Sequence, residues 1–408
     1  MMNKFIDTTK GSISNYFHFI KSSDLGSFAV VGGLVIIAVI FQIGNKNFLT
    51  PLNLTNLMSQ ISAIGILSVG VILVLLIGEI DLSMGAVSGA CAAIMAVLVT
   101  AHGVPSIIAI IVAILAGLLI GALHGFFVAK IHVPSFIVTL AGLLVWQGVQ
   151  LFVLGDTGTI NLRDPLIRGI ANTLVPPWLG WLIGIISVLI IIYMTLRERR
   201  QRARAGLSIQ PISMAITRLV IISIAILVGI GLMNIDRNQQ IQGNPIQGIP
   251  TAVVCFLGFV VFFYIITRYT VFGRHIYTVG GNAEAARRAS IDVDSVRILV
   301  FALCSGIAAC GGIVFASRLI AVNYGSGGGS VLLNAIAAAV IGGTSLFGGR
   351  GSTWSALLGA MVIGSINNGM DLMSFPSSIK YMVTGLVLLL AVMIDSISRE
   401  RRKRAGRA

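Results

Sequence analysis

Charged residues are scarce in this chain. They make up only 10% of its 408 residues, and hydrophobic residues make up 56%. A soluble protein of this length carries about 25% charge, so the composition excludes a soluble globular fold. Because the apolar residues form long runs, we predict an all-α polytopic membrane protein whose helices cross the bilayer.

Acidic residues are the scarcest charged type, with 14 Asp and Glu against 28 Lys and Arg. The resulting net charge of +14 could indicate a nucleic-acid partner. The basic residues, however, occupy short loops and tails between apolar segments, where they orient a membrane protein by staying in the cytoplasm. We therefore expect a lipid membrane, and no nucleic acid, around this chain.

Residues that support catalysis or metal binding are also few. The five histidines are scattered, and the four cysteines lie inside apolar segments without a CxxC pair. Cysteines in such positions usually serve as small buried hydrophobic residues. We predict no metal site and no catalytic residue, which argues against a membrane-embedded enzyme. The cysteines are Cys91, Cys255, Cys304 and Cys310.

Twelve apolar segments are each long enough, or nearly so, to cross a bilayer. The segment at 331–347 is short and leads into a glycine-rich stretch, so a broken or half-buried segment is an alternative there, and 10–12 crossings are possible. The predicted spans are 27–44, 55–78, 83–101, 105–129, 134–154, 177–196, 213–234, 249–267, 298–321, 331–347, 353–372 and 378–395.

Charge placement orients these spans. With twelve crossings and both termini cytoplasmic, 22 of the 28 basic residues lie inside, as the positive-inside rule requires. The domains are then a cytoplasmic segment at 1–26, one transmembrane domain at 27–396 and a basic cytoplasmic tail at 397–408. The loops at 155–176 and 235–248 face outward, either as solvated connectors or as a surface for an extracytoplasmic partner.

A long polar loop at 268–297, here called the coupling loop, is the richest in charge between spans. Within it, Asn282 is a suitable N-cap for a short helix. Glu284 suits the start of that helix, and Arg287 and Arg288 suit its end, because of the helix dipole. The helix either docks on another protein or is an ordinary connector between two spans.

Five stretches of the chain form recognisable motifs. They are GNAEAAR at 281–287, GEIDLSMG at 78–85, PSFIVTLAG at 134–142, NAIAAAVIGGTSLFGGRG at 334–351 and GSINNG at 364–369. These motifs resemble those of the permease subunits of ATP-binding-cassette (ABC) monosaccharide importers of the ribose, xylose and arabinose type. The resemblance covers about residues 50–155 and 268–396, with the motifs in the family's order.

This resemblance implies a type II-like importer permease in the bacterial plasma (inner) membrane. Two copies would form a homodimer, an ATPase subunit would dock on each coupling helix, and an extracytoplasmic binding protein would deliver the monosaccharide. The insert at 197–248 resembles the xylose-type permease, so the substrate is expected to be D-xylose or another pentose. The implied docking residues are Gly281, Asn282, Ala283, Glu284, Ala285, Ala286, Arg287 and Arg288.

Three positions depart from the family pattern. Ser290 stands where the family usually has the glycine that ends the coupling helix, Glu79 replaces a glycine, and Asn334 replaces an acid. The string at 343–350, GTSLFGGR, has the glycine spacing of a Walker A loop but lacks its Lys-Ser/Thr pair. We therefore expect no cofactor on this chain and place ATP with Mg²⁺ on the partner subunit.

Polar residues in or beside the spans are the remaining candidates. Glu79, Asp81 and Ser83 form a turn that is either a gate or coupling contact or a simple helix cap. His124 within a span is expected to be neutral and hydrogen-bonded between helices. Amides and an aromatic ring suit a sugar path, although amides between helices also serve as packing contacts. The path candidates are Gln60, Trp146, Gln147, Asn334, Asn367 and Asn368.

The main alternative is a proton-coupled secondary sugar transporter, which shares twelve spans and a basic loop after the sixth. The loop between spans two and three, GEIDLSMG, lacks the GxxxDRxGRR-like pattern of that superfamily. The spans also lack a series of acids for proton relay. Both observations favour the ABC permease.

Overall fold

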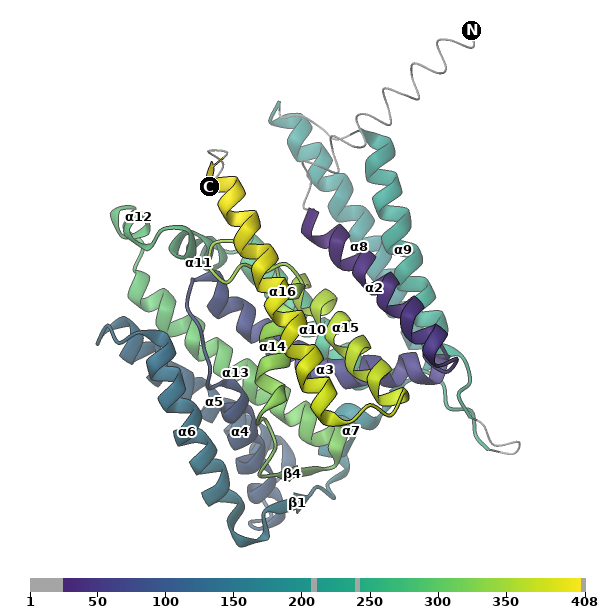
Figure 1. Ribbon diagram of the computed structural model, residues 1–408, viewed down its shortest axis with the longest axis vertical. Helices are drawn as coiled ribbons and strands as arrows, with labels where there is room; N and C mark the ends of the chain where they lie inside the picture. Colours follow the sequence, from purple (N-terminus) through teal and green to yellow (C-terminus); the bar gives the residue numbers. More distant parts are fainter. Residues whose placement is uncertain (1–24, 207–210, 239–242, 405–408) are drawn as a thin grey trace.

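The computed structural model describes residues 25–206, 211–238 and 243–404 (Figure 1). Helices form most of this part of the chain, and short strands pair beside them. In chain order the elements are α2 (Leu25–Gly44), α3 (Pro51–Leu76), α4 (Met84–Thr100), α5 (Ser106–Ala129), α6 (Ser135–Leu154), η1 (Gly155–Thr157), β1 (Thr159–Asn161), α7 (Pro165–Asn172), β2 (Leu174–Val175), α8 (Pro177–Arg204), α9 (Ile212–Asn234), β3 (Ile249–Pro250), α10 (Thr251–Tyr269), α11 (Val271–Gly281), α12 (Ala283–Arg288), α13 (Val293–Leu319), β4 (Ala321–Asn323), α14 (Ser330–Ile341), α15 (Trp354–Leu372) and α16 (Ser377–Arg404).

A helix occurs at each of the twelve predicted spans. Within the described residues, eight helices are long and apolar enough to cross a membrane. The polytopic helical fold is therefore confirmed, whereas the number of crossings and the cytoplasmic location of both termini stay predictions. The predicted segment at 1–26 lies almost wholly outside the described residues, as do the last four residues of the basic tail.

The helix α14 is shorter than the span predicted at 331–347, because it ends at Ile341. The following chain uses left-handed backbone, with φ of +107° at Gly343 and +85° at Gly348, which glycine adopts without strain. A helix of 12 residues is about 18 Å long, against an apolar bilayer core of about 30 Å. The predicted end of this span was wrong, and the broken-segment alternative describes it better.

The core is built where α13 crosses α5 and α3. Glycines at 117, 121 and 125 all lie on the face of α5 that meets α13. A Cβ at Gly121 would overlap the carbonyl oxygen of Phe301 and lie 2.7 Å from the Cα of Ala302. The glycine repeat therefore lets two helix backbones touch, as small residues do in membrane proteins, which confirms its packing role.

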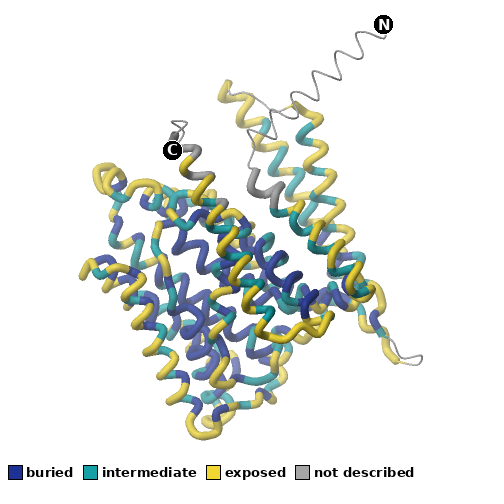
Figure 2. Tube along the Cα trace, in the orientation of Figure 1, coloured by how far each residue is buried: buried dark blue, intermediate teal, exposed yellow. Residues whose placement is uncertain are grey.

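The periphery is formed by the α8–α9 hairpin and by α16. Only 11% of the most apolar stretch of α8 is buried, 6% of that of α9 and none of that of α16. Figure 2 shows these helices largely exposed beside the buried centre. Their outer faces are apolar, as surfaces in contact with lipid are.

Two small antiparallel sheets lie in the connections between helices. One pairs β1 with β4 and the other pairs β2 with β3. Figure 1 places β1, β4 and α7 at the end opposite α11 and α12. Asp164 caps α7 by accepting a hydrogen bond from the N–H of Ile167 at 3.0 Å, and hydrogen bonds from Ser106 and Ile167 lower the pKa of its carboxyl. The loop predicted as a solvated connector at 155–176 is thus folded.

Candidate functional site

The coupling loop folds into two helices, α11 and α12, before α13 begins. Thr270 caps α11 by accepting a hydrogen bond from the N–H of Gly273 at 3.1 Å. Asn282 caps α12 by accepting one from the N–H of Ala285 at 2.9 Å. The predicted capped helix at α12 is confirmed, whereas α11 was not predicted. Its glycines and aromatic residues make a weak helix signal.

The end of α12 shows how the departure at Ser290 is accommodated. Ser290 adopts a left-handed conformation with φ of +61°, which costs more for serine than for glycine. The N–H of Ile291 reaches back to the carbonyl of Ala286 at 3.1 Å, a bond that closes helices ending in this way. The glycine-type ending is therefore kept with a serine in place.

The outer surface of α12 is small and charged. Ala286 is fully buried against the rest of the protein, whereas Ala285 and both arginines of the helix are exposed. Glu284 pairs with Arg288 across one helical turn at 3.5 Å. Gly281 and Asn282 are exposed, and Ala283 is half-buried. One face of α12 thus anchors the helix while the other is open to a partner.

A junction of glycines connects α11 to the core. A Cβ at Gly280 would overlap the carbonyl oxygen of Leu76, the last residue of α3. The same carbonyl accepts a hydrogen bond from the N–H of Gly349 at 2.9 Å. Tyr277 donates its hydroxyl to the carbonyl of Gly351 at 2.8 Å. We call this meeting of α3, α11 and the 342–352 loop the glycine junction.

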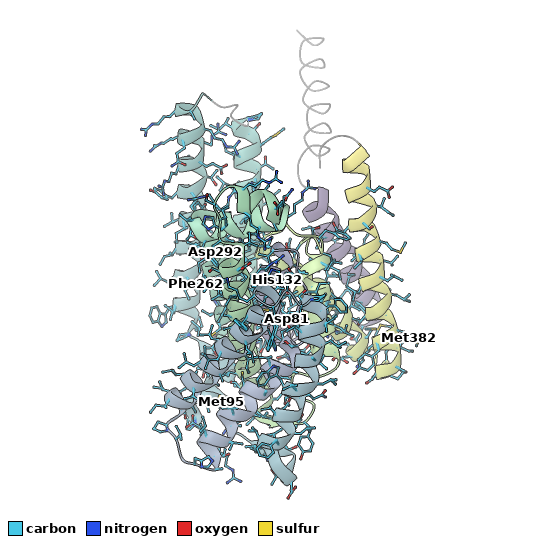
Figure 3. The ribbon with its side chains drawn as sticks, turned by 90° about the vertical axis from the view of Figure 1, so that its left-hand side faces the viewer. Asp81, Met95, His132, Phe262, Asp292 and Met382 are labelled. Carbon is cyan, nitrogen blue, oxygen red and sulfur yellow. The ribbon has the colours of Figure 1, made fainter. Side chains whose placement is uncertain are left out.

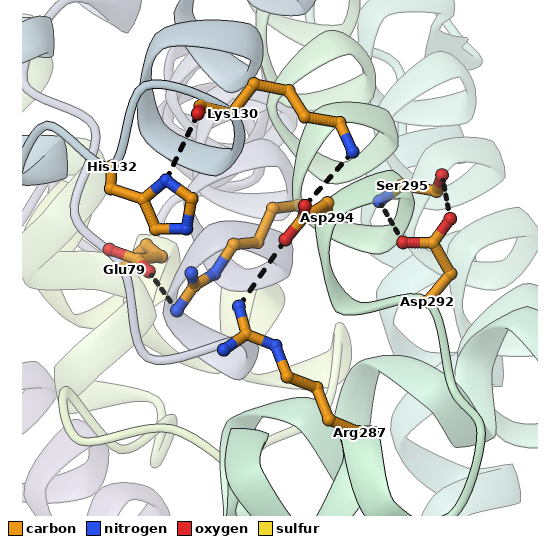
Figure 4. Close-up of polar contacts among 8 residues, drawn as sticks. Glu79, Lys130, His132, Arg287, Asp292, Asp294 and Ser295 are labelled. Atoms are coloured by element: carbon orange, nitrogen blue, oxygen red, sulfur yellow. Dashed lines mark hydrogen bonds and ion pairs between the residues drawn. The ribbon is translucent and has the colours of Figure 1, made fainter.

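Ion pairs surround the start of α13 beside the glycine junction (Figure 4). Asp294 accepts contacts from Lys130 at 3.0 Å and from Arg287 at 3.5 Å. Glu79 pairs with Arg297 at 3.0 Å, and their side chains are only 16% and 20% exposed. The pair gives Glu79 a role that a glycine could not fill, since a glycine has no side chain to meet Arg297. This ion pair was not predicted from the sequence.

Asp292 fixes the first turn of α13. Its carboxylate accepts the N–H of Ser295 at 3.1 Å and the hydroxyl of the same residue at 2.6 Å. These two hydrogen bonds lower the pKa of the Asp292 carboxyl, so the residue stays ionised where the helix dipole favours a negative charge. The chain therefore leaves α12 and enters α13 through two capped ends.

The turn after α3 buries Asp81, which is 4% exposed and is labelled in Figure 3. One carboxylate oxygen accepts the N–H of Ser83 at 2.8 Å and its hydroxyl at 2.6 Å. Ser83 occupies the N-cap position of α4 but makes no side-chain cap. The simple capping alternative is therefore wrong for Ser83, whose hydroxyl is used within the turn.

His124 extends this turn into a buried polar chain. Trp146 donates its indole N–H to Nε2 of His124 at 3.0 Å. Nε2 is therefore the acceptor, so the proton of the neutral ring is on Nδ1, 3.3 Å from the Ser83 hydroxyl. Protonation of Nε2 would place two N–H groups against each other. As expected, His124 is hydrogen-bonded between helices, here joining α4, α5 and α6.

The path candidates do not gather in one place. Trp146 and Gln147 belong to α6, which packs mainly on α4, whereas the others come from α3, α14 and α15, which pack on one another. Asn368 and Asn53 exchange hydrogen bonds of 2.8 and 3.1 Å between their amides. Asn368 therefore holds α15 to α3, the packing alternative for this residue.

The remaining candidates differ in exposure. Asn334 is buried, and its Oδ1 has no hydrogen-bond partner among the described residues. Gln147 is exposed, while Gln60 and Asn367 are half-buried. A buried amide that the sequence reading missed, Gln150, donates to the carbonyls of Asn323 and Ser326, both at 2.9 Å. The assignment of these residues to a sugar path stays a prediction.

A small apolar cavity lies close to Gln150. It has a volume of about 10 Å³, enough for about one water molecule. The lining residues come from α3, α4, α13, α14 and the loop before α14, and they include Ser88, Gly89 and Ser326. A monosaccharide does not fit there.

Residues 53–392 match the family described as "Branched-chain amino acid transport system / permease component". The chain belongs to this permease family. A permease component is one part of a transport system, so the chain works with other subunits. No solved structure matches the permease.

Curated relatives of the permease include sugar transporters. It is 35% identical to the xylose transport system permease protein XylH of Escherichia coli K12 over 95% of this chain and 96% of that protein. The XylH of Haemophilus influenzae is 33% identical over 94% and 99%, and the ribose import permease protein RbsC of E. coli K12 is 30% identical over 95% and 99%. The resemblance to ABC monosaccharide permeases is confirmed.

Proposed function

We propose that the permease is the transmembrane subunit of an ATP-dependent importer that carries D-xylose, or a closely similar pentose, across the bacterial inner membrane. Its similarity to xylose permeases extends over nearly the whole chain and exceeds its similarity to the ribose permease. In the proposed complex, two copies form a homodimer, an ATPase subunit docks on each α12, and an extracytoplasmic binding protein supplies the sugar.

The glycine junction is the observation that supports coupling through α12. The backbone of α11 touches the end of α3, and the 342–352 loop is hydrogen-bonded to the same carbonyl of Leu76. Contacts between backbones have no side-chain rotamers to absorb a displacement. A partner that moves α12 therefore moves α3 and the 342–352 loop with it, which is how closure of two ATPase subunits would reach the spans.

ATP is assigned to the partner. In a phosphate-binding loop, backbone N–H groups point at the nucleotide. In the Walker-like string of this chain, the N–H of Gly349 is bonded to Leu76 and that of Ser345 to the carbonyl of Arg350 at 3.0 Å. This string also follows a helix of the membrane domain. The permease would accordingly bind neither nucleotide nor Mg²⁺.

The proton-coupled alternative gains no support from the buried charges. Among the described residues, Asp81 is the acidic side chain that is buried, and it is hydrogen-bonded within its own turn. Proton relays through a membrane use a series of ionisable groups. Asp81 and the buried His124 are linked through the Ser83 hydroxyl, but these two groups form one local pair and not such a series.

The test is uptake of labelled D-xylose by proteoliposomes that hold the permease, its ATPase and its binding protein. We expect uptake to require ATP on the side of the membrane that α12 faces. Uptake should persist when a protonophore collapses the pH gradient. Uptake without ATP that stops with the protonophore would show a secondary transporter. Uptake of ribose but not xylose would retain the importer and correct its substrate.

The docking role is tested by Ala285→Arg, which enlarges the exposed face of α12. We expect ATPase stimulation by the permease to fall about tenfold, which corresponds to about 1.4 kcal/mol of docking free energy. The matched control is Ala101→Arg, at an exposed alanine that ends α4, which should leave stimulation unchanged. Equal stimulation by both variants, with both inserted normally in the membrane, would contradict docking on α12.

A further inference from the structure

Two helices far apart in the sequence end in nearly the same string. The end of α8 reads RERRQR at 197–202, and the end of α16 reads RERRKR at 399–404. The segments 197–204 and 399–404, here called the arginine collars, each hold five basic residues and one Glu. Together they carry eight of the fourteen net positive charges of the chain.

The lengths of the two helices place the collars at the membrane surface. Both α8 and α16 have 28 residues, about 42 Å of helix. The apolar part of α8 ends at Leu196, after 20 residues, which is about the 30 Å thickness of the hydrocarbon core. The residues that follow therefore lie at the depth of the phospholipid headgroups and just beyond it.

Both helices lie on the outside of the protein. Apart from α9, α8 has little packing, and the most apolar stretch of α16 is unburied. Figure 1 shows the collar ends of both helices at the same end of the molecule as α11 and α12, the end predicted to be cytoplasmic. Lipid is consequently the neighbour of the outer faces of these helices.

The collar on α8 presents arginines outward. Arg197, Arg200 and Arg204 are exposed, and their spacing of three and four residues places them on one face. The acidic residue of this collar is already used, since Glu198 pairs with Arg202 at 3.0 Å. The exposed Arg197, Arg200 and Arg204 are not part of this pair.

The orientation of these helices in the membrane does not require arginine in particular. Lysine and arginine serve the positive-inside rule equally, yet nine of the ten basic residues in the collars are arginines. A guanidinium binds two phosphate oxygens at once, which lysine does not. We propose that the arginine collars bind the phosphate groups of anionic phospholipids, such as phosphatidylglycerol, in the cytoplasmic leaflet.

The consequence is a lipid requirement at the rim of the permease. Each basic residue near an anionic surface adds about 1 kcal/mol of attraction. One collar therefore holds an anionic headgroup more tightly than it holds a zwitterionic headgroup. The proposal does not depend on the transported solute. It stands or fails separately from the importer function.

The experiment is native mass spectrometry of the full-length permease released from nanodiscs of equal phosphatidylglycerol and phosphatidylcholine. The variant is Arg197→Gln with Arg200→Gln and Arg204→Gln. We expect about a hundredfold lower retention of phosphatidylglycerol at this collar, since three surface charges are lost, and unchanged retention of phosphatidylcholine. The control is Arg163→Gln with Arg168→Gln, two exposed arginines beside α7 at the opposite end, which should retain as much as the wild type.

A second variant replaces the same three arginines by lysine, which keeps the charges that orient α8. It should insert normally and retain phosphatidylglycerol less than the wild type, because the two-pronged phosphate contact is lost. Wild-type retention by both variants would overturn the proposal. Displacement of the lipid by millimolar inorganic phosphate would also overturn it, because it would indicate a site for free phosphate. Loss of ATPase binding with unchanged lipid retention would overturn it too, because it would indicate a surface for a protein.

Discussion

The crossing of α5 and α13 and the hairpin of α8 and α9 both pair two apolar helices, but they do so differently. At the crossing, the missing side chain of Gly121 is replaced by the backbone of α13. In the hairpin, Gly184 faces only the flexible end of Ile230, and Gly229 faces nothing within 4 Å. The same residue type thus sets the distance between helices in the core and has little effect at the rim.

This difference separates the part of the permease that can transmit a displacement from the part that cannot. Backbones in contact move together, whereas side chains in a loosely packed pair change rotamer instead. The coupling loop is joined to the first kind of packing, through the glycine junction. Four substitution pairs test the distinction.

The largest effect is expected at the glycine junction itself. Gly280→Ala places a methyl group on the carbonyl of Leu76, and overpacking of this kind costs about 3 kcal/mol. Gly258 of α10 gives the matched control, because it is exposed and a Cβ there meets nothing within 4 Å. Xylose uptake and thermal unfolding in detergent should both fall for Gly280→Ala and stay unchanged for Gly258→Ala; equal behaviour would remove the junction from the coupling path.

The helix crossing comes next. Gly121→Ala should lower the free energy of unfolding by about 2 kcal/mol, because the α5 and α13 backbones must separate. Gly229→Ala, in the hairpin, should change it by less than about 0.5 kcal/mol. Unfolding monitored by tryptophan fluorescence measures both, and a hairpin variant as unstable as the core variant would break the comparison.

An ion pair from each region gives a smaller effect. Glu79→Gln removes the charged partner of Arg297 from a half-buried ion pair. This should lower the free energy of unfolding by about 1.5 kcal/mol. Glu198→Gln removes a pair that is 60% and 45% exposed, and exposed pairs contribute about 0.5 kcal/mol or less. A double-mutant cycle with Arg297→Gln isolates the first pair, and a coupling energy near zero would show that Glu79 acts otherwise.

The smallest effect is a reciprocal exchange of helix ends. Ser290→Gly relieves the left-handed serine after α12 and should raise the free energy of unfolding by about 0.5–1 kcal/mol. Gly206 has φ of +66° after α8, so Gly206→Ser should lower that free energy by a similar amount. Differential scanning calorimetry compares the two, and stabilisation by both would mean that backbone strain is not the cause.

Local patterns predicted much of this molecule. The spans follow from apolar length, the cap of α12 from Asn282, and the close helix approach from glycines four residues apart. The length of α14 was misjudged, although Gly342 and Gly343 already indicated an early end. In each case the information lies within one helix or its neighbours along the chain.

Contacts between distant segments were not predictable in this way. The glycine junction joins residues 76, 280 and 349, and Arg297 meets Glu79 across more than 200 residues. No periodicity in one segment reports what lies opposite it in space. The same holds for the buried polar chain from Trp146 to Asp81, whose members come from α6, α5 and the turn after α3, and for the scattered path candidates.

The short α14 also has a consequence for how the protein is made. Its 12 helical residues and the unwound stretch after them expose backbone groups that lipid cannot satisfy. During biosynthesis, this segment cannot leave the translocon for the bilayer by itself. We expect it to enter the bilayer packed against α3 and α15, its main neighbours, so that about the last fifth of the chain is assembled onto helices already in place and not inserted helix by helix.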